Sequence, residues 1–563
     1  MTHSNDVPGP DSTDYKIALT VGICGLALYV RTLAPDILYG DSAEFQTLAY
    51  TLGMTHSTGY PIYLLFARLV GFLPIASPAW RVNLVSALCA AWTVGGVYLL
   101  ARYFTPNRTG AVLGSIALAL SYTFWAQAII AEVYTPGMAV LTTVLLLLAR
   151  WQREPFGRRR ALAWATGLTC LALGVHLSAT LIAPTALLFV LWVVAFQPKT
   201  QWWPILRYAF IGFGIGIVVY FTAFILLDLN NPPSSFIQVM LYPSRSVWGL
   251  TAAELDSVFT RWWLTVMSVQ WRDVMFPEGG FAVAISEYFN RVLSQEFSLW
   301  MIGFALLGLG EINHSARRLA RNAGNPELET PATRAKAFVK SIPTAPTLSL
   351  GVFMVVTYLV MLAFVLNYRP GDQYVFYLVT YIFISTAIGV GIGRTLEWTK
   401  RFLGKRKNWT RYLYPPVAVL CALVVVAAYA DARWDALKAG KGTFVQEMYP
   451  YPLDNLQEPR QIYAMRLFLL PEDAYVVMNW RGLYSMYYLA HVEGLRPNIV
   501  IKEATPYGSN NQIADSLLEE MIDTVRAGER PVFVDQIYPG LRDHFRVMPT
   551  AGGNFYRLTI PRN

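Results

Sequence analysis

Residues 208–227 read YAFIGFGIGIVVYFTAFILL, without a single charged side chain. A helix of about 20 mostly apolar residues crosses the hydrocarbon core of a bilayer, so this run predicts a membrane-spanning helix. Further runs of similar composition occur at 16–34, 82–103, 111–130, 133–149, 161–176, 177–196, 298–312, 346–366, 374–393 and 412–430. The sequence therefore predicts a polytopic α-helical membrane protein, with about eleven transmembrane helices in the segment 16–430.

The composition of the whole chain agrees with this prediction. Of its 563 residues, 55% are hydrophobic and only 14% are charged, whereas soluble domains average about 45–50% and about 25%. These values exclude a disordered chain and a conventional soluble enzyme.

The formal net charge of +9 would also suit a nucleic-acid-binding protein, provided that the basic residues share one accessible face. They lie instead in alternate short loops, clustered within 150–160, 317–340 and 400–411. Short loops rich in Lys and Arg stay in the cytoplasm. We therefore expect the lipid bilayer and no nucleic acid as a partner, a cytoplasmic N-terminus in the plasma (inner) membrane, and an outer position for the loops 35–81 and 228–297.

The two ends of the chain are the least membrane-like parts. Residues 1–15 are polar and rich in turn-forming residues, and they predict a disordered cytoplasmic N-terminus. Residues 431–563 have the composition of a soluble domain and follow the last predicted span on its outer side. Here we expect a small extracytoplasmic α/β domain, with strands at 474–478, 498–501 and 531–534 and an amphipathic helix at 513–525.

The first outer loop carries a dense group of ionisable residues. It contains GDSAEF at 40–45 and HSTGYP from His56 onward. Two apolar-faced segments, 43–52 and 62–73, are expected to form short helices at the membrane surface. The Gly and Pro residues between them predict a tight turn that carries His56 and Tyr60.

Asp41 and Glu44 in this loop admit two interpretations. Their spacing suits a helix-capping box, with Asp41 as the N-cap and Glu44 reaching back to it. It also suits a general base at the membrane interface, where partial burial raises the pKa of a carboxyl group. The two roles are compatible, because a capped helix holds its carboxylate rigidly.

Further candidates occupy the other outer loops and helix ends. Glu132 lies in a short loop without basic residues, either as a solvated carboxylate or facing a cavity. His176, at the end of a span, is either a packing histidine or part of a site. Arg369 either pairs with Asp372 or binds a phosphate group. Arg245 belongs to the large Trp-rich loop, which forms either an interfacial aromatic belt or a site for a sugar and a lipid phosphate.

Several classes of protein are disfavoured by what the sequence lacks. It has no Walker A motif, no H-E-x-x-H zinc motif and no Cys/His cluster with metal-ligand spacing. A transporter would carry ionisable residues near mid-span, whereas here the acidic groups gather at the predicted outer ends. The pattern favours an enzyme that works at the outer membrane surface, with a lipid or solute transporter or a sensor as the alternative.

Short motifs make the chain resemble a known family. They are GDSAE from Gly40, HSTGYP from His56, WRVNL from Trp80, AEVY from Ala131 and LGVH from Leu173. With them the chain resembles the GT-C glycosyltransferases, in particular the former domain-of-unknown-function family that includes animal transmembrane protein O-mannosyltransferases. The departures from the family's usual pattern are Ala43, Ser57, Thr58 and Val175. They lie beside the proposed site and bear on the identity of the sugar and the acceptor.

The resemblance implies a GT-C-like fold and a transfer reaction. A sugar, with a mannose-like hexose as the first choice, would move with inversion from a polyprenyl-phosphate-linked donor to a hydroxyl acceptor. The acceptor would be a Ser/Thr side chain of an exported protein, or alternatively a lipid or an envelope glycan. By motif position Asp41 would be the catalytic base, with Glu44 beside it.

The remaining candidates would then have binding roles. The cavity for the sugar and the acceptor would be lined by His56, Tyr60, Glu132 and His176. Arg369, with Arg245 as the weaker choice, would hold the lipid phosphate. Carboxylates such as these are able to ligate a divalent cation, but the resemblance favours activity without a metal, so no cofactor is expected.

Overall fold

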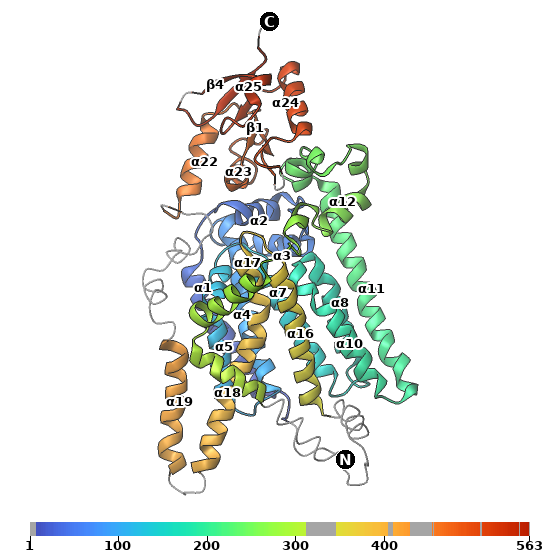
Figure 1. The fold of residues 1–563 in the computed structure, drawn as a ribbon, viewed down its shortest axis with the longest axis vertical. Helices are drawn as coiled ribbons and strands as arrows, with labels where there is room; N and C mark the ends of the chain where they lie inside the picture. The colour runs from blue at the N-terminus through green and yellow to red at the C-terminus, as the bar shows by residue number, and fades with distance from the viewer. Residues whose placement is uncertain are drawn as a thin grey trace.

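The computed structural model describes residues 7–310, 345–403, 409–427, 453, 455–506, 509–550 and 552–561. The chain forms a long helical body with a small sheet-containing domain at one end (Figure 1). Two predicted features, the basic cluster within 317–340 and the domain boundary at 430/431, lie outside the described residues.

Most of the helical body consists of apolar helices. Their bounds are α1 Ser12–Thr32, α4 Pro78–Arg102, α5 Arg108–Ala119, α6 Tyr122–Ala128, α7 Tyr134–Trp151, α8 Arg159–Leu171, α9 Leu177–Thr180, α10 Ile182–Ala195, α11 Lys199–Asn230, α16 Pro346–Asn367, α18 Leu378–Leu403 and α19 Trp409–Ala427. Among the described residues, 7 stretches of helix are long and apolar enough to cross a membrane, or 8 if the bent pair of α5 and α6 is one span. The predicted helical membrane architecture is confirmed, and the number of eleven spans stays a prediction.

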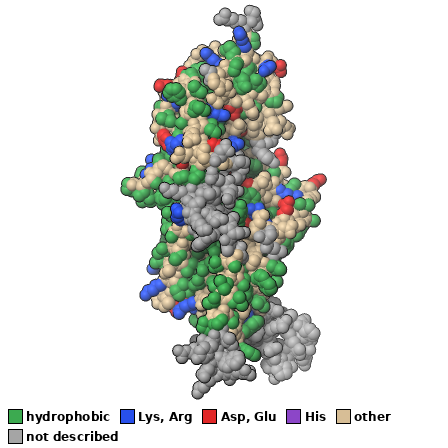
Figure 2. Space-filling model, turned by 90° about the vertical axis from the view of Figure 1, so that its left-hand side faces the viewer, with side chains coloured by type: hydrophobic (Ala, Val, Ile, Leu, Met, Phe, Trp, Pro, Cys, Tyr) green, Lys and Arg blue, Asp and Glu red, His purple; other side chains and the backbone are tan. Residues whose placement is uncertain are grey.

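Large apolar side chains cover much of the outside of this body. On α11, Phe210, Phe213 and Ile215 are each more than half exposed. Figure 2 shows one face of the molecule, on which hydrophobic side chains cover the middle of the body and acidic side chains lie toward the end with the sheet. Such a wide apolar surface is unfavourable in water and suits contact with lipid tails.

Glycines allow pairs of these helices to pack closely. Gly110 and Gly114 of α5 face Gly389 and Gly393 of α18, and a Cβ added at Gly114 would lie 2.6 Å from the Gly389 Cα. A Cβ at Gly212 of α11 would likewise collide with the backbone of α8. Small residues spaced four apart are the usual means by which membrane helices bring their backbones together.

The first helix begins earlier than expected. α1 starts inside the segment 1–15, where Asp11 and Asp14 form a capping box. The Asp14 carboxylate is buried and accepts hydrogen bonds from Arg102 and Arg108, each at 2.9 Å. The last part of this segment is therefore helical and anchored, and the prediction of a disordered N-terminus is wrong for it.

The two short helices expected in the first loop are present. α2 spans Gly40–Thr51 and α3 spans Pro61–Gly71, and the turn between them carries His56 and Tyr60 as predicted. Both helices lie at the end of the body that faces the sheet domain (Figure 1). The loop thus holds its ionisable residues at the junction of the two parts of the molecule.

The C-terminal sheet, as far as the structure describes this part of the chain, has five strands in the order β2-β1-β3-β5-β4. The bounds are β1 Tyr475–Met478, β2 Val500–Glu503, β3 Val532–Val534, β4 Arg546–Pro549 and β5 Tyr556–Thr559. β1, β2 and β3 are parallel and confirm the three predicted strands, and α24 (Asp515–Ala527) confirms the predicted helix. β5 and β4, which pair antiparallel, were not predicted. The carboxyl ends of parallel strands share one edge, where α/β domains commonly bind ligands.

The sheet domain is attached to the first loop through α23 (Trp480–Tyr487), which packs on α2. The Ser485 hydroxyl donates to the Leu38 carbonyl at 2.6 Å. The Thr47 hydroxyl of α2 lies 3.1 Å from the Tyr484 carbonyl and donates to it. These contacts seat the carboxyl edge of the parallel strands directly above the ionisable residues of the first loop.

Candidate active site

A cavity of about 930 Å³, called the polar cavity below, lies at the junction of the helical body and the sheet domain. Its walls come from the first loop, the segment between α6 and α7, the large loop 228–297, the segment between α16 and α18, and the C-terminal domain. The titratable and aromatic residues that line it include Asp41, His56, Tyr60, Glu132, Trp271, Asp273, Tyr368, Asp372, Trp480 and Glu503. Four of the predicted site residues therefore converge on one cavity.

The capping-box interpretation of Asp41 and Glu44 is wrong. The N-cap of α2 is Tyr39, and its side chain makes no capping bond. The Asp41 Oδ1 instead accepts a 2.7 Å hydrogen bond from the indole nitrogen of Trp480. The Glu44 side chain points toward the turn between α2 and α3, where its Oε1 accepts a hydrogen bond from the backbone N–H of His56 at 2.8 Å.

Glu44 and His56 form a buried charge pair next to Asp41. The His56 Nδ1 lies 2.5 Å from Glu44 Oε2, and its Nε2 lies 3.9 Å from Asp41 Oδ2. The Glu44 side chain is fully buried, whereas that of Asp41 is 41% exposed and faces the cavity. Glu44 therefore orients the imidazole, and the carboxylate available to a substrate is that of Asp41.

The electrostatics of this group fix its protonation at neutral pH. Burial alone would lower the pKa of His56, but the carboxylates of Glu44 and Asp41 outweigh it and raise the pKa to about 9. The imidazole therefore carries a positive charge at neutral pH. A protonated histidine cannot accept a further proton, so Asp41 is the better candidate for a general base.

Glu132 and Asp372 provide further carboxyl groups in the cavity lining. Burial, followed by the nearby charge of Asp41, raises the pKa of Glu132 well above its ordinary value and that of Asp372 to about 6. The Ser42 hydroxyl donates to Glu132 at 3.4 Å, and the Tyr134 hydroxyl donates to Asp372 at 3.3 Å. This shift favours the protonated form of Glu132, in which the carboxyl group is able to donate a hydrogen bond to a ligand.

Tyr60 and His176 have different positions relative to the cavity. Tyr60 lines it, and its hydroxyl donates to the Ser57 carbonyl at 2.8 Å. His176 is buried behind Tyr60, with the two rings stacked at 6.1 Å, and its Nδ1 lies 2.5 Å from the Ser178 hydroxyl. His176 is not among the lining residues, so the structure agrees with the packing interpretation and not with a cavity role.

The two arginines predicted to bind phosphate do not reach the cavity. The Arg369 Nη1 donates to the Gly279 carbonyl at 2.8 Å, and Arg369 makes no ion pair with Asp372 among the described residues. Arg245 lies over the Tyr242 ring at 4.7 Å and donates to its carbonyl. None of the described residues that line the cavity is Lys or Arg. Phosphate binding by Arg369 and Arg245 therefore stays a prediction.

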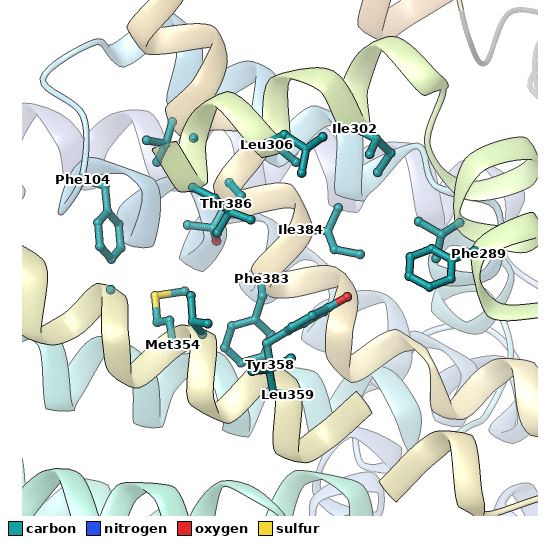
Figure 3. Close-up of a pocket in the computed structure, with 18 of the residues that line it drawn as sticks. Phe104, Phe289, Ile302, Leu306, Met354, Tyr358, Leu359, Phe383, Ile384 and Thr386 are labelled. Atoms are coloured by element: carbon teal, nitrogen blue, oxygen red, sulfur yellow. The ribbon is translucent and has the colours of Figure 1, made fainter. Parts of the chain in front are cut away.

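An apolar cavity of about 330 Å³ lies within the helical body, between the helix Leu299–Gly310, α16 and α18. Figure 3 shows its apolar side chains pointing into one space, with Tyr358 as the one labelled aromatic bearing an oxygen. At its edge, the Tyr288 hydroxyl lies 3.1 Å from the hydroxyl of Tyr358 and 2.9 Å from that of Thr380.

The helix α13 (Phe281–Arg291) borders both cavities. Its Tyr288 and Phe289 line the apolar cavity, whereas its last residue, Arg291, lies over the ring of Tyr374 at 4.2 Å. Tyr374 lines the polar cavity. The Arg291 guanidinium is 3.4 Å from Glu296 and 22% exposed. Sequence reasoning overlooked this cation, because nothing in its neighbourhood along the chain sets it apart from the other arginines of the large loop.

The C-terminal contribution to the site was also overlooked. Trp480, Glu503 and Thr505 follow the carboxyl ends of β1 and β2 and line the cavity. These residues are far from Asp41 along the chain. The one signal in the sequence that could have indicated them is their position at or just after the end of a predicted strand. The described residues contain no group of three or more His, Cys, Asp or Glu side chains arranged for a metal ion. Activity without a cofactor stays a prediction.

The fold of the chain has a counterpart among solved structures. The chain superposes on ArnT from Cupriavidus metallidurans in the apo state with a TM-score of 0.53, over 98% of this chain and 100% of that one. The two sequences are 11% identical, so this likeness concerns the fold. The chain therefore shares the fold of ArnT.

Residues 41–202 match the family model described as "Protein O-mannosyl-transferase TMEM260 N-terminal domain". Protein O-mannosyl-transferase TMEM260 of Mus musculus is 28% identical over 142 residues, which are 25% of this chain and 20% of that protein. The Dictyostelium discoideum protein of the same name is 22% identical over 220 residues, or 36% of this chain and 26% of that protein. The matched parts thus span about a fifth to a quarter of these relatives. The resemblance to the GT-C superfamily is confirmed, and Asp41 opens the matched segment.

Proposed function

We propose that the protein is a membrane glycosyltransferase that moves a mannose-like hexose from a polyprenyl-phosphate donor to a hydroxyl acceptor on the outer membrane face. The acceptor of first choice is a Ser or Thr side chain of an exported protein. The observation that carries the proposal is the position of Asp41, exposed in a large polar cavity and held by Trp480. The names of the relatives over residues 41–202 support the same reaction class.

In this proposal Asp41 acts as the general base of a single displacement. The acceptor hydroxyl attacks the anomeric carbon while its proton passes to the Asp41 carboxylate. The bond between the anomeric carbon and the phosphate oxygen breaks, and the polyprenyl phosphate leaves with the electron pair. A single attack from the face opposite the leaving group inverts the anomeric configuration. The Trp480 hydrogen bond fixes the carboxylate, which leaves one oxygen to meet the acceptor.

The donor would approach from the apolar cavity. The lining of this cavity is almost purely hydrophobic and suits part of a prenyl chain. Arg291 lies between this cavity and the polar one and is the arginine best positioned to meet the phosphate. An arginine there would stabilise the negative charge that develops on the leaving phosphate. Arg291 thus replaces Arg369 and Arg245 in the proposed donor site.

The test is sugar transfer by the purified protein in detergent, with polyprenyl-phosphate mannose and a Ser/Thr-rich peptide. We expect Asp41→Asn to lose at least about a hundredfold in kcat, because the base contributes about that much in such reactions. Asp256→Asn, which alters an exposed aspartate of the large loop, is the matched control. A fully active Asp41→Asn protein, or a product that retains the donor's anomeric configuration, would overturn the proposal. Transfer to lipid or glycan fractions and not to peptide would change the acceptor class and leave the reaction intact.

A further inference from the structure

Glu503, the last residue of β2, has a buried carboxyl group in the wall of the polar cavity. The residue is 2% exposed and belongs to the cavity lining. Its Oε2 has no hydrogen-bond partner within the described part of the chain. A buried polar oxygen without a partner is costly, so a fold that keeps one at the edge of a cavity indicates a partner that comes from outside.

The neighbouring residue of the strand, Lys502, has its polar group paired within the protein. Successive side chains of a strand point to opposite faces. The ammonium of Lys502 lies on the other side, where it donates to the Gln238 carbonyl at 2.7 Å and lies 3.6 Å from Glu520. Lys502 is therefore satisfied within the protein, whereas the Oε2 of Glu503, a residue of the cavity wall, has no partner among the described residues.

One residue, Trp480, contacts both Glu503 and the proposed base Asp41. The Trp480 indole donates to Asp41, and the backbone N–H groups of Thr505 and Trp480 face the Glu503 carboxyl. Other side chains of the C-terminal domain complete this wall with neutral hydrogen-bonding groups: Thr505, Ser509, Asn510 and Asn511. The wall belongs to the sheet domain, whereas the apolar cavity and Arg291 belong to the helical body.

We propose that Glu503 binds the acceptor, and that the wall formed by Glu503, Thr505, Ser509, Asn510 and Asn511 takes a neutral polypeptide segment whose hydroxyl is thereby presented to Asp41. This inference rests on the proposed function and specifies its acceptor site. Neutral hydroxyl and amide groups suit the carbonyls and N–H groups of a peptide. An anionic glycan or phospholipid would meet carboxyl groups with no lysine or arginine among the described lining residues.

The protonation of Glu503 gives this role a pH dependence. Burial raises the pKa of Glu503 to about 8, with the N–H of Thr505 opposing and Asp535 adding to the rise. The titratable groups that face it from neighbouring elements are Asp535 after β3, Tyr538, and Tyr484 of α23. Below pH 8 the carboxyl group donates a hydrogen bond to a peptide carbonyl, and above pH 8 it loses this proton.

The experiment measures the KM values of donor and acceptor separately, together with native mass spectrometry of the bound donor. Glu503→Ala should raise the peptide KM about tenfold, as expected for one lost hydrogen bond to a ligand, while the donor KM changes less than about twofold. Glu503→Gln keeps a hydrogen-bond donor and should stay within about threefold of the wild type at pH 7. Its peptide KM should also lose the rise that the wild type shows above pH 8.

Glu519→Gln, an exposed glutamate of α24, is the matched control and should behave as the wild type. An unchanged peptide KM in Glu503→Ala, or an equal loss for donor and acceptor, would overturn the inference. Because donor binding is read independently, these outcomes differ from a failure of the proposed function, in which the wild type itself would neither bind the donor nor transfer sugar.

Discussion

The positive charge of His56 depends on the Glu44 carboxylate. The substitution Glu44→Gln removes the negative charge of that side chain and keeps its shape. Burial alone would lower the pKa of His56 below 6.5, but the two nearby carboxylates raise it to about 9. The rise from 6.5 to about 9 corresponds to about 3 kcal/mol in favour of the imidazolium, at about 1.4 kcal/mol per pKa unit. Glu44→Gln keeps the side-chain shape, and the amide oxygen still accepts from the His56 N–H. It removes the negative charge that contributes most to the rise.

The expected result follows from the direction of each shift. Wild-type His56 is protonated through the neutral range and loses its proton as the pH rises through about 9. In Glu44→Gln we expect the pKa of His56 to fall to about 6.5 or below, so the imidazolium forms only at acid pH. If transfer needs this charge beside Asp41, the wild type declines near pH 9. The variant then loses about tenfold at pH 7.5 and recovers as the pH is lowered.

The assay is the pH profile of sugar transfer at saturating donor and acceptor. Glu278→Gln, an exposed glutamate of the large loop, is the matched control. Carbon-13 NMR of labelled histidine, with the His56 signal assigned by its loss in His56→Gln, reads the protonation without turnover. A Glu44→Gln protein whose activity still declines only near pH 9, with its His56 signal titrating there as well, would refute the reasoning.

Two further predictions concern arginines. Arg291→Gln should raise the donor KM about tenfold and leave the peptide KM unchanged, because its guanidinium lies between the two cavities; equal KM values for donor in variant and wild type would contradict it. Arg460, in α22 (Glu458–Phe468), donates to Asp36 at 2.5 and 2.8 Å and to Glu493 at 2.6 and 2.7 Å. Because these groups are partly exposed, Arg460→Ala should cost about 1–2 kcal/mol, seen as a thermal midpoint lowered by several degrees. The exposed Arg542→Ala is the control for both, and a midpoint unchanged in Arg460→Ala would show that the bridge adds no stability.

The features that could be predicted from sequence are those set by local pattern. An apolar run long enough to cross a bilayer predicts a helix wherever it occurs, and the runs became the helices of the body. The two short helices of the first loop and the strands β1 to β3 follow the same logic, because each carries its own periodicity. β4 and β5 are short and flanked by exposed polar residues, so their alternation was too weak to indicate a strand.

The parts of the site that escaped prediction depend on tertiary contacts. Glu44 was expected to cap its helix, but in the folded chain its Oε2 lies 2.5 Å from the His56 Nδ1 and pairs with it instead. Arg369 was expected to face Asp372 or a phosphate group, whereas its Nη1 donates to the Gly279 carbonyl of the large loop at 2.8 Å. Local spacing contains no information on either partner. Asp41, which lines the cavity, could be singled out because its motif is local, and its role as the base, implied by the resemblance, stays a prediction.

The geometry also explains why the C-terminal domain belongs to the site and does not merely cover it. The exposed carboxylate of Asp41 has one strong neutral donor, the Trp480 indole, which comes from that domain. Asp36, at the start of the same loop, is held by Arg460 of that domain. Without these contacts the Asp41 side chain would be free to rotate, and a base that samples several rotamers loses the orientation on which proton transfer depends. In the proposed mechanism the docking of the sheet domain would therefore both position the base and bring Glu503 to the acceptor, so that one interface would assemble the two halves of the reaction.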